Sequence, residues 1–384
     1  MIYLDNAATS YPKPASVIET VAECMALWCA NPGRAGHDNA MRSSRAVYDT
    51  RKNIAHFIGG SAEPEEIVFT SNCTDAVNIG LKGLLKPGDH VITTMMEHNS
   101  VIRPLYALRK KGVETSLLKC TAEGYPEKGS LEKALKKNTK LIICTLSSNV
   151  TGTLMPVQEI GEFARRHGII FMIDAAQGIG SIPFDLADSG AHILAASGHK
   201  ALMGPQGTGF LYINKNIKLE TIKEGGTGTE SSSAVQPEIS PERFESGTLN
   251  VPGIVGLNEG IKYIQAEGIK NIRRRETELM TCLREELEGS DGIVMYGPES
   301  AEKKTAVIAF NIEGMDCEEA AAHLNERYGI AVRSGYHCAA MAHKAIGTEK
   351  TGCIRASLGP FTKYEDIIAA ADAIRELAEN RNIR

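Results

Sequence analysis

Residues 157–174 read VQEIGEFARRHGIIFMID, an amphipathic stretch that passes directly into an apolar one. In the first part, apolar residues recur at the spacing that places them on one side of a helix. In the second part, an unbroken apolar run leads to Asp174. A strand that is apolar along its whole length is covered on both faces of its sheet. The stretch therefore predicts a helix followed by a buried strand.

The same alternation continues on both sides of this stretch, from about residue 65 to about residue 215. Buried strands that alternate with helices are typical of a sheet with helices on both faces. We therefore expect a three-layer α/β/α domain whose sheet is mostly parallel. The apolar runs predict strands at 65–70, 90–94, 113–118, 140–146, 192–197 and 208–213, and the amphipathic segments predict helices at 73–85, 100–112 and 131–137.

The polar segment 224–250 is rich in Gly, Ser and Pro, which indicates a linker or a functional loop. We predict two domains: a large one of residues 15–250, and a smaller α+β domain of residues 1–14 and 251–384. In the second part, helices are expected at 253–268, 269–289, 316–327 and 363–380, and strands at 305–312 and 330–334.

The composition argues against several classes of function. The 384 residues carry a formal net charge of −5, and 42% of them are hydrophobic and 23% charged. This balance gives no electrostatic reason to expect nucleic acid or an anionic membrane as a partner. The opening MIYLDNAATSYPKP lacks the pattern of a signal peptide, and the nine cysteines include no CxxC pair. We expect a soluble cytoplasmic protein without a disulfide framework.

Polar residues follow two of the expected strands, at the edge where open α/β sheets bind ligands. Asp174 ends one strand, and Ser197, His199 and Lys200 end or follow the next. A buried carboxylate needs a donor or a cation as partner, and lysine is the usual amine for a Schiff base. The ordinary interpretations, a turn cap for Asp174 and a surface position for Lys200, stay open at this point.

Two further groups lie at strand ends. SNCTDA (71–76) opens a helix, where backbone N–H groups and Thr74 would face an anion or simply form a cap. MEHNS (96–100) places His98 where an imidazole would stack on a flat ring or cap a helix. An amine, a phosphate cradle and a carboxylate are the parts that pyridoxal phosphate requires, so the set as a whole favours that cofactor.

Three motifs carry a resemblance to a known family: SGHK (197–200), DAAQ (174–177) and RSGYHCA (333–339). From YLDNAAT (3–9) to CIRASLG (353–359), the sequence resembles the fold-type I pyridoxal phosphate enzymes of the class V aminotransferase superfamily. It is most similar to the Suf-type cysteine desulfurases and selenocysteine lyases. The resemblance implies a homodimeric enzyme that binds pyridoxal phosphate and acts on L-cysteine or a similar amino acid.

The resemblance also implies a role for each matching residue. Lys200 would hold the cofactor as an imine and move the Cα proton, and Asp174 would pair with the pyridine nitrogen. His98 would stack on the ring, and Gln177 would bind its hydroxyl group. The phosphate would be bound by Cys73, Thr74, Ser197 and His199, with Thr227 from a second subunit. Asn149 would lie near the ring hydroxyl and the substrate, and Arg355 would clamp the substrate carboxylate. Arg333 and Arg34 would line the mouth of the pocket.

The cysteine of RSGYHCA decides the expected chemistry. In the Suf-like enzymes this residue attacks the sulfur of the substrate, which implies that Cys338 becomes a persulfide while L-alanine is released. Two competing interpretations are a zinc site of His337, Cys338 and His343, and a buried structural role for Cys338. The zinc site lacks a fourth ligand and the usual spacing, so we expect no metal.

The sequence departs from the family at three places, one of which is PFT (360–362), where the family carries YNT after the carboxylate-binding arginine. The other two are position 73 and the segment after the cysteine motif. Cys73 stands where Suf-type enzymes carry a threonine, and residues 340–352 after the cysteine motif diverge. Since the second segment shapes the substrate pocket and the surface for a protein sulfur acceptor, other functions stay open. They are a selenocysteine lyase, a cysteine-sulfinate lyase, a class V aminotransferase, and a sulfur-relay or assembly protein that does not depend on turnover.

Overall fold

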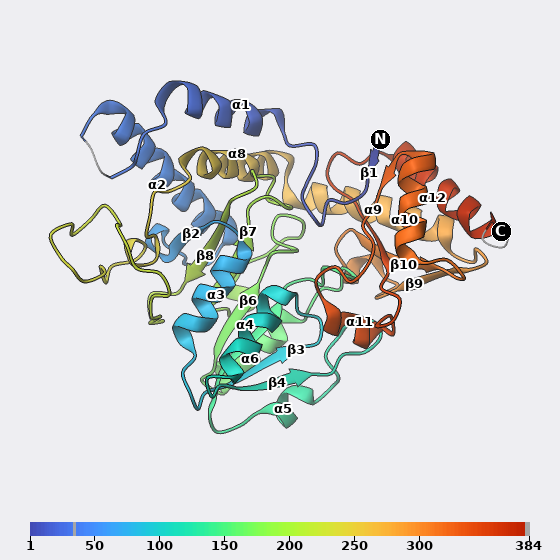
Figure 1. Ribbon diagram of the computed structural model, residues 1–384, viewed down its shortest axis with the longest axis horizontal. Helices are drawn as coiled ribbons and strands as arrows, with labels where there is room; N and C mark the ends of the chain where they lie inside the picture. Colours follow the sequence, from blue (N-terminus) through green and yellow to red (C-terminus); the bar gives the residue numbers. More distant parts are fainter. Residues whose placement is uncertain (34–35, 381–384) are drawn as a thin grey trace.

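The computed structural model describes residues 1–33 and 36–380, which include a central seven-stranded sheet (Figure 1). Neighbouring strands run parallel, except that β8 is antiparallel to both β2 and β7. The mostly parallel sheet predicted from the sequence is therefore confirmed. In order across the sheet, the strands are β2 (Ile67–Thr70), β8 (Gly209–Ile213), β7 (Ile193–Ser197), β6 (Ile170–Asp174), β5 (Thr139–Thr145), β3 (His90–Thr94) and β4 (Glu114–Leu118).

Helices cover both faces of this sheet. Ile142 and Phe171 point to one face, where they share a core with α2, α6 and α8. Their sequence neighbours Leu141 and Met172 point to the other face, where they share a core with α3 and α4. Because successive strand residues face opposite sides, strands that are apolar throughout bury both faces and produce the predicted three layers. The helices are α2 (Asp38–Ile58), α3 (Cys73–Leu84), α4 (Asn99–Arg109), α6 (Val157–Arg166) and α8 (Val251–Glu267).

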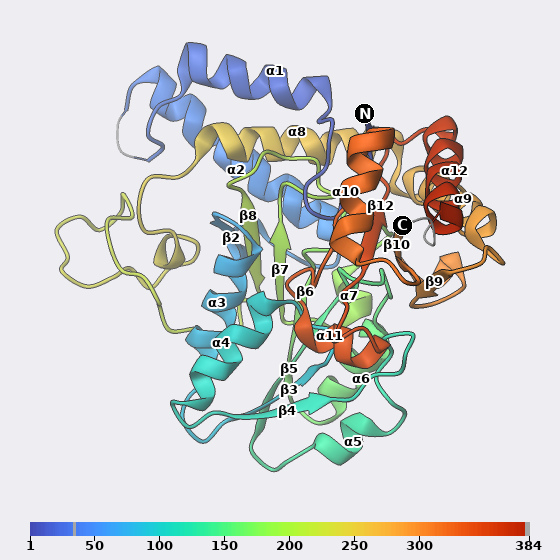
Figure 2. The ribbon, with the colours of Figure 1, turned by 45° about the vertical axis from the view of Figure 1, so that its right-hand side comes forward.

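A smaller α+β unit lies beside the large sheet (Figure 2). Its antiparallel sheet has the order β12-β10-β9 and shares a core with α9, α10 and α12. The start of the chain joins this unit, because β1 pairs in parallel with β11 and Leu4 lies in the same core. The bounds are β1 (Ile2–Tyr3), α9 (Ile269–Leu287), β9 (Ile293–Tyr296), β10 (Val307–Ile312), α10 (Cys317–Tyr328), β11 (Ile330–Ala331), β12 (Ile354–Ser357) and α12 (Tyr364–Glu379).

The core contacts of α8 suggest another boundary than the predicted division at residue 251. α8 was expected in the smaller domain, but its buried residues Ile254, Leu257 and Ile261 belong to the core that also contains the large sheet. α8 packs against both α1 (Ala15–Glu23) and α2 and lies between them (Figure 2), so it buries apolar residues on more than one side. We therefore propose that the large domain extends through α8.

Several elements differ from the sequence prediction. The strand expected at 330–334 ends at Ala331, since Arg333 turns away to form an isolated antiparallel bridge with Arg355. α2 was not predicted because its buried face includes the polar residues Ser43, Thr50 and Arg51, which disguise the helical pattern. Also unpredicted are α1, a π-helical turn (Cys24–Trp28), α7 (Leu186–Ser189), β9, α11 (Ala340–Ile346) and β12, while the helix expected at 131–137 is α5 (Ser130–Ala134).

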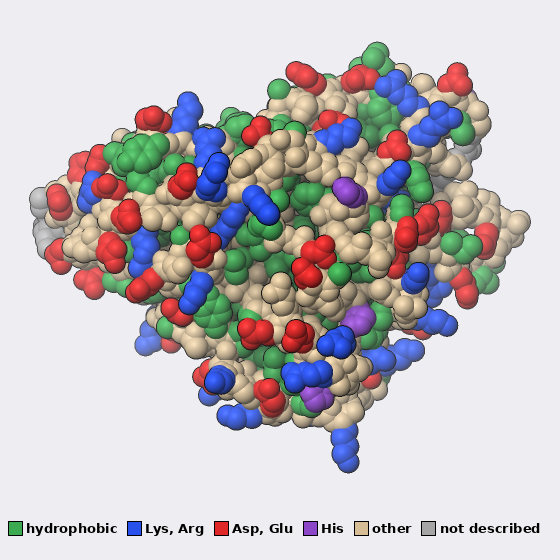
Figure 3. All heavy atoms as spheres, turned by 180° about the vertical axis from the view of Figure 1, so that it is seen from behind, with side chains coloured by type: hydrophobic (Ala, Val, Ile, Leu, Met, Phe, Trp, Pro, Cys, Tyr) green, Lys and Arg blue, Asp and Glu red, His purple; other side chains and the backbone are tan. Residues whose placement is uncertain are grey.

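The surface agrees with the charge balance of the sequence. Figure 3 shows acidic and basic side chains interspersed over one face of the molecule. Within the described residues, no helix is both long enough and apolar enough to cross a membrane. The location in the cytoplasm stays a prediction.

Candidate active site

Two adjacent parallel strands bring the expected carboxylate and amine to one edge of the sheet. Asp174 is the last residue of β6 and is 2% exposed, and partly buried Lys200 lies just beyond the end of β7. Burial lowers the pKa of the Lys200 amine, an effect that nearby Cys73 and Asp174 oppose. An amine with a lowered pKa is a better nucleophile toward carbonyl groups near neutral pH.

Three hydrogen bonds hold the Asp174 carboxylate. Oδ1 accepts from the Ala176 backbone N–H at 3.0 Å and from the Cys73 thiol at 3.3 Å. Oδ2 accepts from the Ser100 hydroxyl at 3.2 Å. Ser100 could not be recognised from the sequence, because serine is common in the first turn of a helix. The carboxylate is thus satisfied although it is almost fully buried.

His98 lies at the start of α4 and caps this helix. Its Nδ1 accepts from the Ser100 backbone N–H at 3.0 Å, so the ring proton of the neutral imidazole lies on Nε2. Burial lowers the pKa of His98, which favours the neutral ring. Ser100 connects this ring to Asp174, because its backbone N–H donates to His98 Nδ1 and its hydroxyl donates to Asp174 Oδ2. His98 is thus linked to the carboxylate through Ser100, and its expected stacking on a bound ring stays a prediction.

The residues expected to bind phosphate lie at the ends of β7 and α3. Cys73 begins α3, with Asn72 as its cap, and Thr74 is exposed in the first turn. Ser197 is buried at the end of β7, and burial lowers the pKa of His199 to about 4. The N–H groups of a helix start lack partners inside the helix, which makes this corner suited to an anion.

The N-terminal segment closes one side of the group. Gln177 donates its side-chain N–H to the Ala7 carbonyl at 2.7 Å. The Ser10 hydroxyl donates to the Lys200 carbonyl at 2.8 Å, and the Lys13 ammonium donates to the His199 carbonyl at 2.7 Å. These contacts fix the loop that carries Lys200 against residues 7–13. In this structure the Gln177 amide faces the N-terminal segment, and its role toward a ring hydroxyl stays a prediction.

Cys338 reaches the same region from the smaller unit. His337 and Cys338 both have left-handed backbone angles, with φ of 48° and 56°. The His337 side chain turns inward, where its Nε2 lies 3.0 Å from the Cys353 carbonyl oxygen, and the Cys338 thiol is exposed. The Cys338 carbonyl accepts from the Asn99 N–H at 2.8 Å, directly beside His98. The turn is thus anchored at the start of α4, and the interpretation of Cys338 as a buried structural residue is wrong.

Asn149 bridges the Cys338 turn to the expected carboxylate clamp. Asn149 donates its amide N–H to the His337 carbonyl at 2.7 Å and accepts at its backbone oxygen from Arg355 Nη1 at 2.9 Å. Arg355 is 1% exposed, and its Nη2 lies 2.8 Å from a carboxylate oxygen of Asp5. Arg333 Nη2 lies 4.0 Å from the Cys338 sulfur. Asp5 belongs to the YLDNAAT motif near the start of the chain. Its position in the sequence does not indicate that it pairs with Arg355, which lies near the C-terminus.

Two expected residues are not brought to this group. Thr227 hydrogen-bonds to Thr229 in its own segment and lines a surface hollow there, so the role expected for it requires a second subunit. Arg34 lies outside the described residues.

The zinc interpretation of the cysteine motif also needs revision. The structure groups His337 and His343 with Cys353, not with Cys338, and their ligand atoms lie within 4.8 Å of one another. The two imidazole rings are stacked, with centroids 5.9 Å apart and planes inclined by 25°. One nitrogen of each ring already lies next to a protein oxygen, at 3.0 Å from the Cys353 carbonyl for His337 and 2.7 Å from the Thr348 hydroxyl for His343, and three ligands are one fewer than a structural zinc site uses. We assign these residues to the packing beneath the Cys338 turn.

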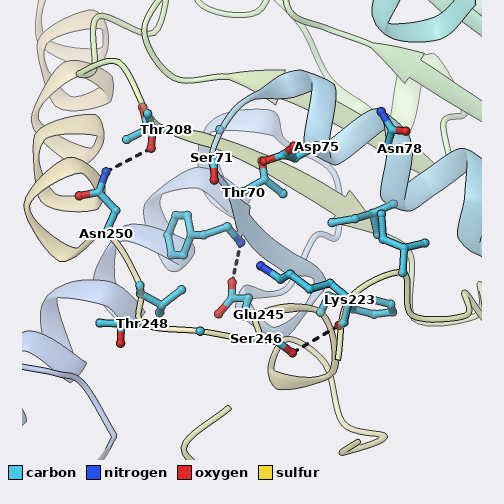
Figure 4. Close-up of a pocket in the computed structure, with 18 of the residues that line it drawn as sticks. Thr70, Ser71, Asp75, Asn78, Thr208, Lys223, Glu245, Ser246, Thr248 and Asn250 are labelled. Atoms are coloured by element: carbon cyan, nitrogen blue, oxygen red, sulfur yellow. Dashed lines mark hydrogen bonds between the residues drawn. The ribbon is translucent and has the colours of Figure 1, made fainter. Parts of the chain in front are cut away.

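A cavity of about 280 Å³ lies on the outer side of the phosphate corner (Figure 4). Its lining includes Ser71 and Asp75 around the start of α3, Thr208 before β8, and residues 244–250. Asn250 donates to the Gly207 carbonyl at 3.1 Å and so holds the start of α8 against this wall. Residues 244–250 of the polar segment therefore form a wall of this cavity, while none of the residues with expected catalytic roles lines it.

Comparisons with known proteins agree with this geometry. The class V aminotransferase family model matches residues 2–369. A Methanothermobacter thermautotrophicus protein named probable cysteine desulfurase is 36% identical over 98% of this chain and 94% of its own length. A Pectobacterium atrosepticum protein named cysteine desulfurase is 35% identical, with coverages of 96% and 90%. The apo cysteine desulfurase of Thermococcus onnurineus NA1 superposes with a TM-score of 0.93 at 35% identity, with coverages of 99% and 95%.

Proposed function

This chain belongs to the class V aminotransferase family, whose members related to it are named cysteine desulfurases, and from that premise we propose that it is a pyridoxal phosphate-dependent cysteine desulfurase. The substrate would be L-cysteine, the products L-alanine and a persulfide on Cys338. The observation that carries the proposal is the anchoring of the Cys338 turn at the Asn99 N–H, beside His98.

The donor set of the site fits pyridoxal phosphate. Lys200 supplies an amine whose pKa is lowered by burial, and Asp174 supplies a buried carboxylate for the ring nitrogen. The start of α3 and the nearby Ser197 supply the donors that a phosphate group needs. When bound, the cofactor would draw electrons from the substrate Cα and so weaken its bond between Cβ and sulfur.

The chain's own residues would supply the remaining steps. Lys200, once released from the cofactor, would take the proton from the substrate Cα and return a proton to the product. Arg355 would hold the substrate carboxylate with the N–H groups that Asp5 and Asn149 leave free, since a guanidinium carries five donors. His98, as a neutral imidazole with its proton on Nε2, would keep the ring in place.

Cys338 would complete the reaction as a nucleophile. Its thiolate attacks the substrate sulfur, so that a sulfur–sulfur bond forms as the bond between Cβ and sulfur breaks. The electron pair of the broken bond remains on the substrate carbon, which takes up a proton and leaves as alanine. Cysteine and a thiol thus become alanine and a persulfide without any outside oxidant. The Arg333 guanidinium lies 4.0 Å from the sulfur, where its positive charge would pair with the attacking thiolate.

Product formation from L-cysteine tests the proposal. The cofactor-loaded protein should release sulfide and alanine in the presence of a thiol reductant. Cys338→Ser should lose both products yet keep the cofactor absorbance near ~400 nm, whereas Lys200→Ala should lose both absorbance and turnover. Cys29→Ser, which removes another exposed thiol, is the matched control and should behave like wild type. A cofactor-loaded wild type that forms neither product would overturn the assignment.

The same proposal includes a homodimer. Large apolar side chains are exposed on α1 and the π-helical turn (Ile18, Met25 and Leu27) and on segment 224–241 (Val235 and Ile239). Figure 1 shows this segment on the side of the large domain away from the smaller unit, and α1 along the top of the same domain. A second copy covering these residues would also bring Thr227 to a neighbouring site. Sedimentation analysis should give about twice the mass of the 41.4 kDa chain, and a monomer at micromolar concentration would contradict this.

A further inference from the structure

Asp174 has two side-chain partners that its expected role does not require. The Cys73 thiol donates to Oδ1 and the Ser100 hydroxyl donates to Oδ2, at 3.3 and 3.2 Å. The two donors come from the first residue of α3 and the first turn of α4, so two different helices fix the two oxygens. The backbone N–H of Ala176 provides a third hydrogen bond, to Oδ1.

Both side chains hold a proton that they can donate. Burial, followed by the nearby Asp174 charge, raises the pKa of the Cys73 thiol well above its ordinary value, so it stays protonated. The Ser100 hydroxyl lies between the Asp174 carboxylate and His98 Nδ1, which already accepts from the Ser100 N–H. The charged oxygen is the stronger acceptor, so the hydroxyl proton points to Asp174.

Hydrogen bonds to a carboxylate stabilise its charged form and reduce its affinity for a further proton. A carboxylate paired with a protonated pyridine nitrogen competes with that nitrogen for one proton. When the carboxylate has fewer hydrogen-bond donors, the shared proton spends more time on its oxygen and less on the nitrogen. The donors around Asp174 therefore act on the nitrogen through the carboxylate.

We propose that Cys73 and Ser100 are positioning residues that keep the negative charge on Asp174 and thereby keep the proton on the pyridine nitrogen of bound pyridoxal phosphate. The proposal rests on the cofactor assignment above, and it gives the thiol at position 73 a function of its own. A hydroxyl at position 73 should serve the same purpose, because it also donates one hydrogen bond.

The direct test is the ¹⁵N resonance of pyridoxal phosphate labelled at the ring nitrogen and bound to the full-length protein. Cys73→Ala and Ser100→Ala should each move this resonance from the protonated toward the neutral pyridine position, and the double variant should move it further. Cys73→Ser and Ser100→Thr keep a donor and should restore the wild-type position. Cys120→Ala, a buried thiol in another core, is the control for general loosening and should leave the resonance unchanged.

The outcomes separate this proposal from the proposed function. An unchanged resonance in both alanine variants, while wild type forms alanine from cysteine, overturns the role of Cys73 and Ser100 alone. A shift that Cys73→Ser does not reverse also overturns it, because a purely structural effect would explain the change. A shift with rescue in a protein that does not act on cysteine supports the role and rejects the desulfurase assignment.

Discussion

Arg355 and Asp5 form an ion pair with 2.8 Å between nitrogen and oxygen, although 350 residues separate them in the chain. The arginine is 1% exposed, while about a fifth of the Asp5 side chain is open to solvent. The pair joins the first turn after β1 to β12 and fixes the guanidinium that we expect to bind the substrate carboxylate. Leaving a buried guanidinium without its counter-charge is costly.

Asp5→Asn should therefore lower the free energy of unfolding by about 2 kcal/mol, since an uncompensated buried charge is the main loss. Urea unfolding of the two proteins measures this difference. The control is Glu114→Gln, which removes an ion pair with Lys136 of the same 2.8 Å length at a well exposed site. That change should be without measurable effect, and equal losses in both variants would show that burial does not matter here.

Glu97 should make the protein less stable as the pH rises. It is fully buried, its Oε1 accepts from the Thr94 hydroxyl and the Thr145 N–H, and burial raises its pKa from 4.5 to about 8. Between these values the unfolded chain ionises the carboxyl while the folded chain keeps it protonated. The folded state thus binds more protons, and stability falls with increasing pH by at most about 1.4 kcal/mol per pH unit from this group.

Glu97→Gln should flatten this dependence, since an amide cannot ionise. The free energy of unfolding, measured at pH 5 and at pH 8, gives the slope for each protein. Glu276, whose pKa burial raises to about 7, contributes a similar slope in both proteins and cancels in the comparison. Identical slopes for wild type and the glutamine variant would show that Glu97 is ionised in the folded protein.

The left-handed turn should cost stability at Cys338 itself. A residue with a Cβ atom at a φ of 56° is strained by about 1 kcal/mol, whereas glycine is not. Cys338→Gly should therefore unfold at a higher urea concentration than Cys338→Ala, although both lose sulfur transfer. Ala340→Gly, in the first turn of α11, is the opposite control and should destabilise by about 1 kcal/mol. A glycine variant less stable than the alanine variant would argue against strain at this turn.

Arg333 should control the reactivity of the Cys338 thiol. One guanidinium nitrogen lies 4.0 Å from the sulfur, and a positive charge at this distance attracts a thiolate, which is the form of a cysteine that reacts. Arg333→Gln should slow the alkylation of Cys338 by iodoacetamide several-fold at pH 7. Mass spectrometry of the two peptides follows both exposed thiols at once, and Cys29 serves as the internal reference. A Cys338 rate that does not change relative to Cys29 would remove Arg333 from the activation of the nucleophile.

The sequence alone determined the central sheet and most of the candidate site. Strands β2, β5, β6, β7 and β8 contain continuous apolar runs, and such runs depend on local composition rather than on distant contacts. Asp174 and Lys200 follow two of these runs, and parallel strands end at the same edge of a sheet. Their proximity could therefore be predicted from their places in the chain.

Tertiary structure alone decided the contacts that join distant segments. Three examples are the ion pair of Asp5, the hydrogen bond that anchors Cys338 at Asn99, and the two side-chain donors on Asp174. The shortest sequence separation among them is 74 residues, between Ser100 and Asp174. Nothing local distinguishes Ser100 from an ordinary helix start, or Asp5 from an ordinary surface acid. The left-handed angles at His337 and Cys338 likewise depend on contacts with distant residues. The His337 imidazole is buried beside the Cys353 carbonyl, and the carbonyl groups of His337 and Cys338 accept hydrogen bonds from Asn149 and Asn99. Local sequence sets which residues can act, and long-range packing sets which of them meet.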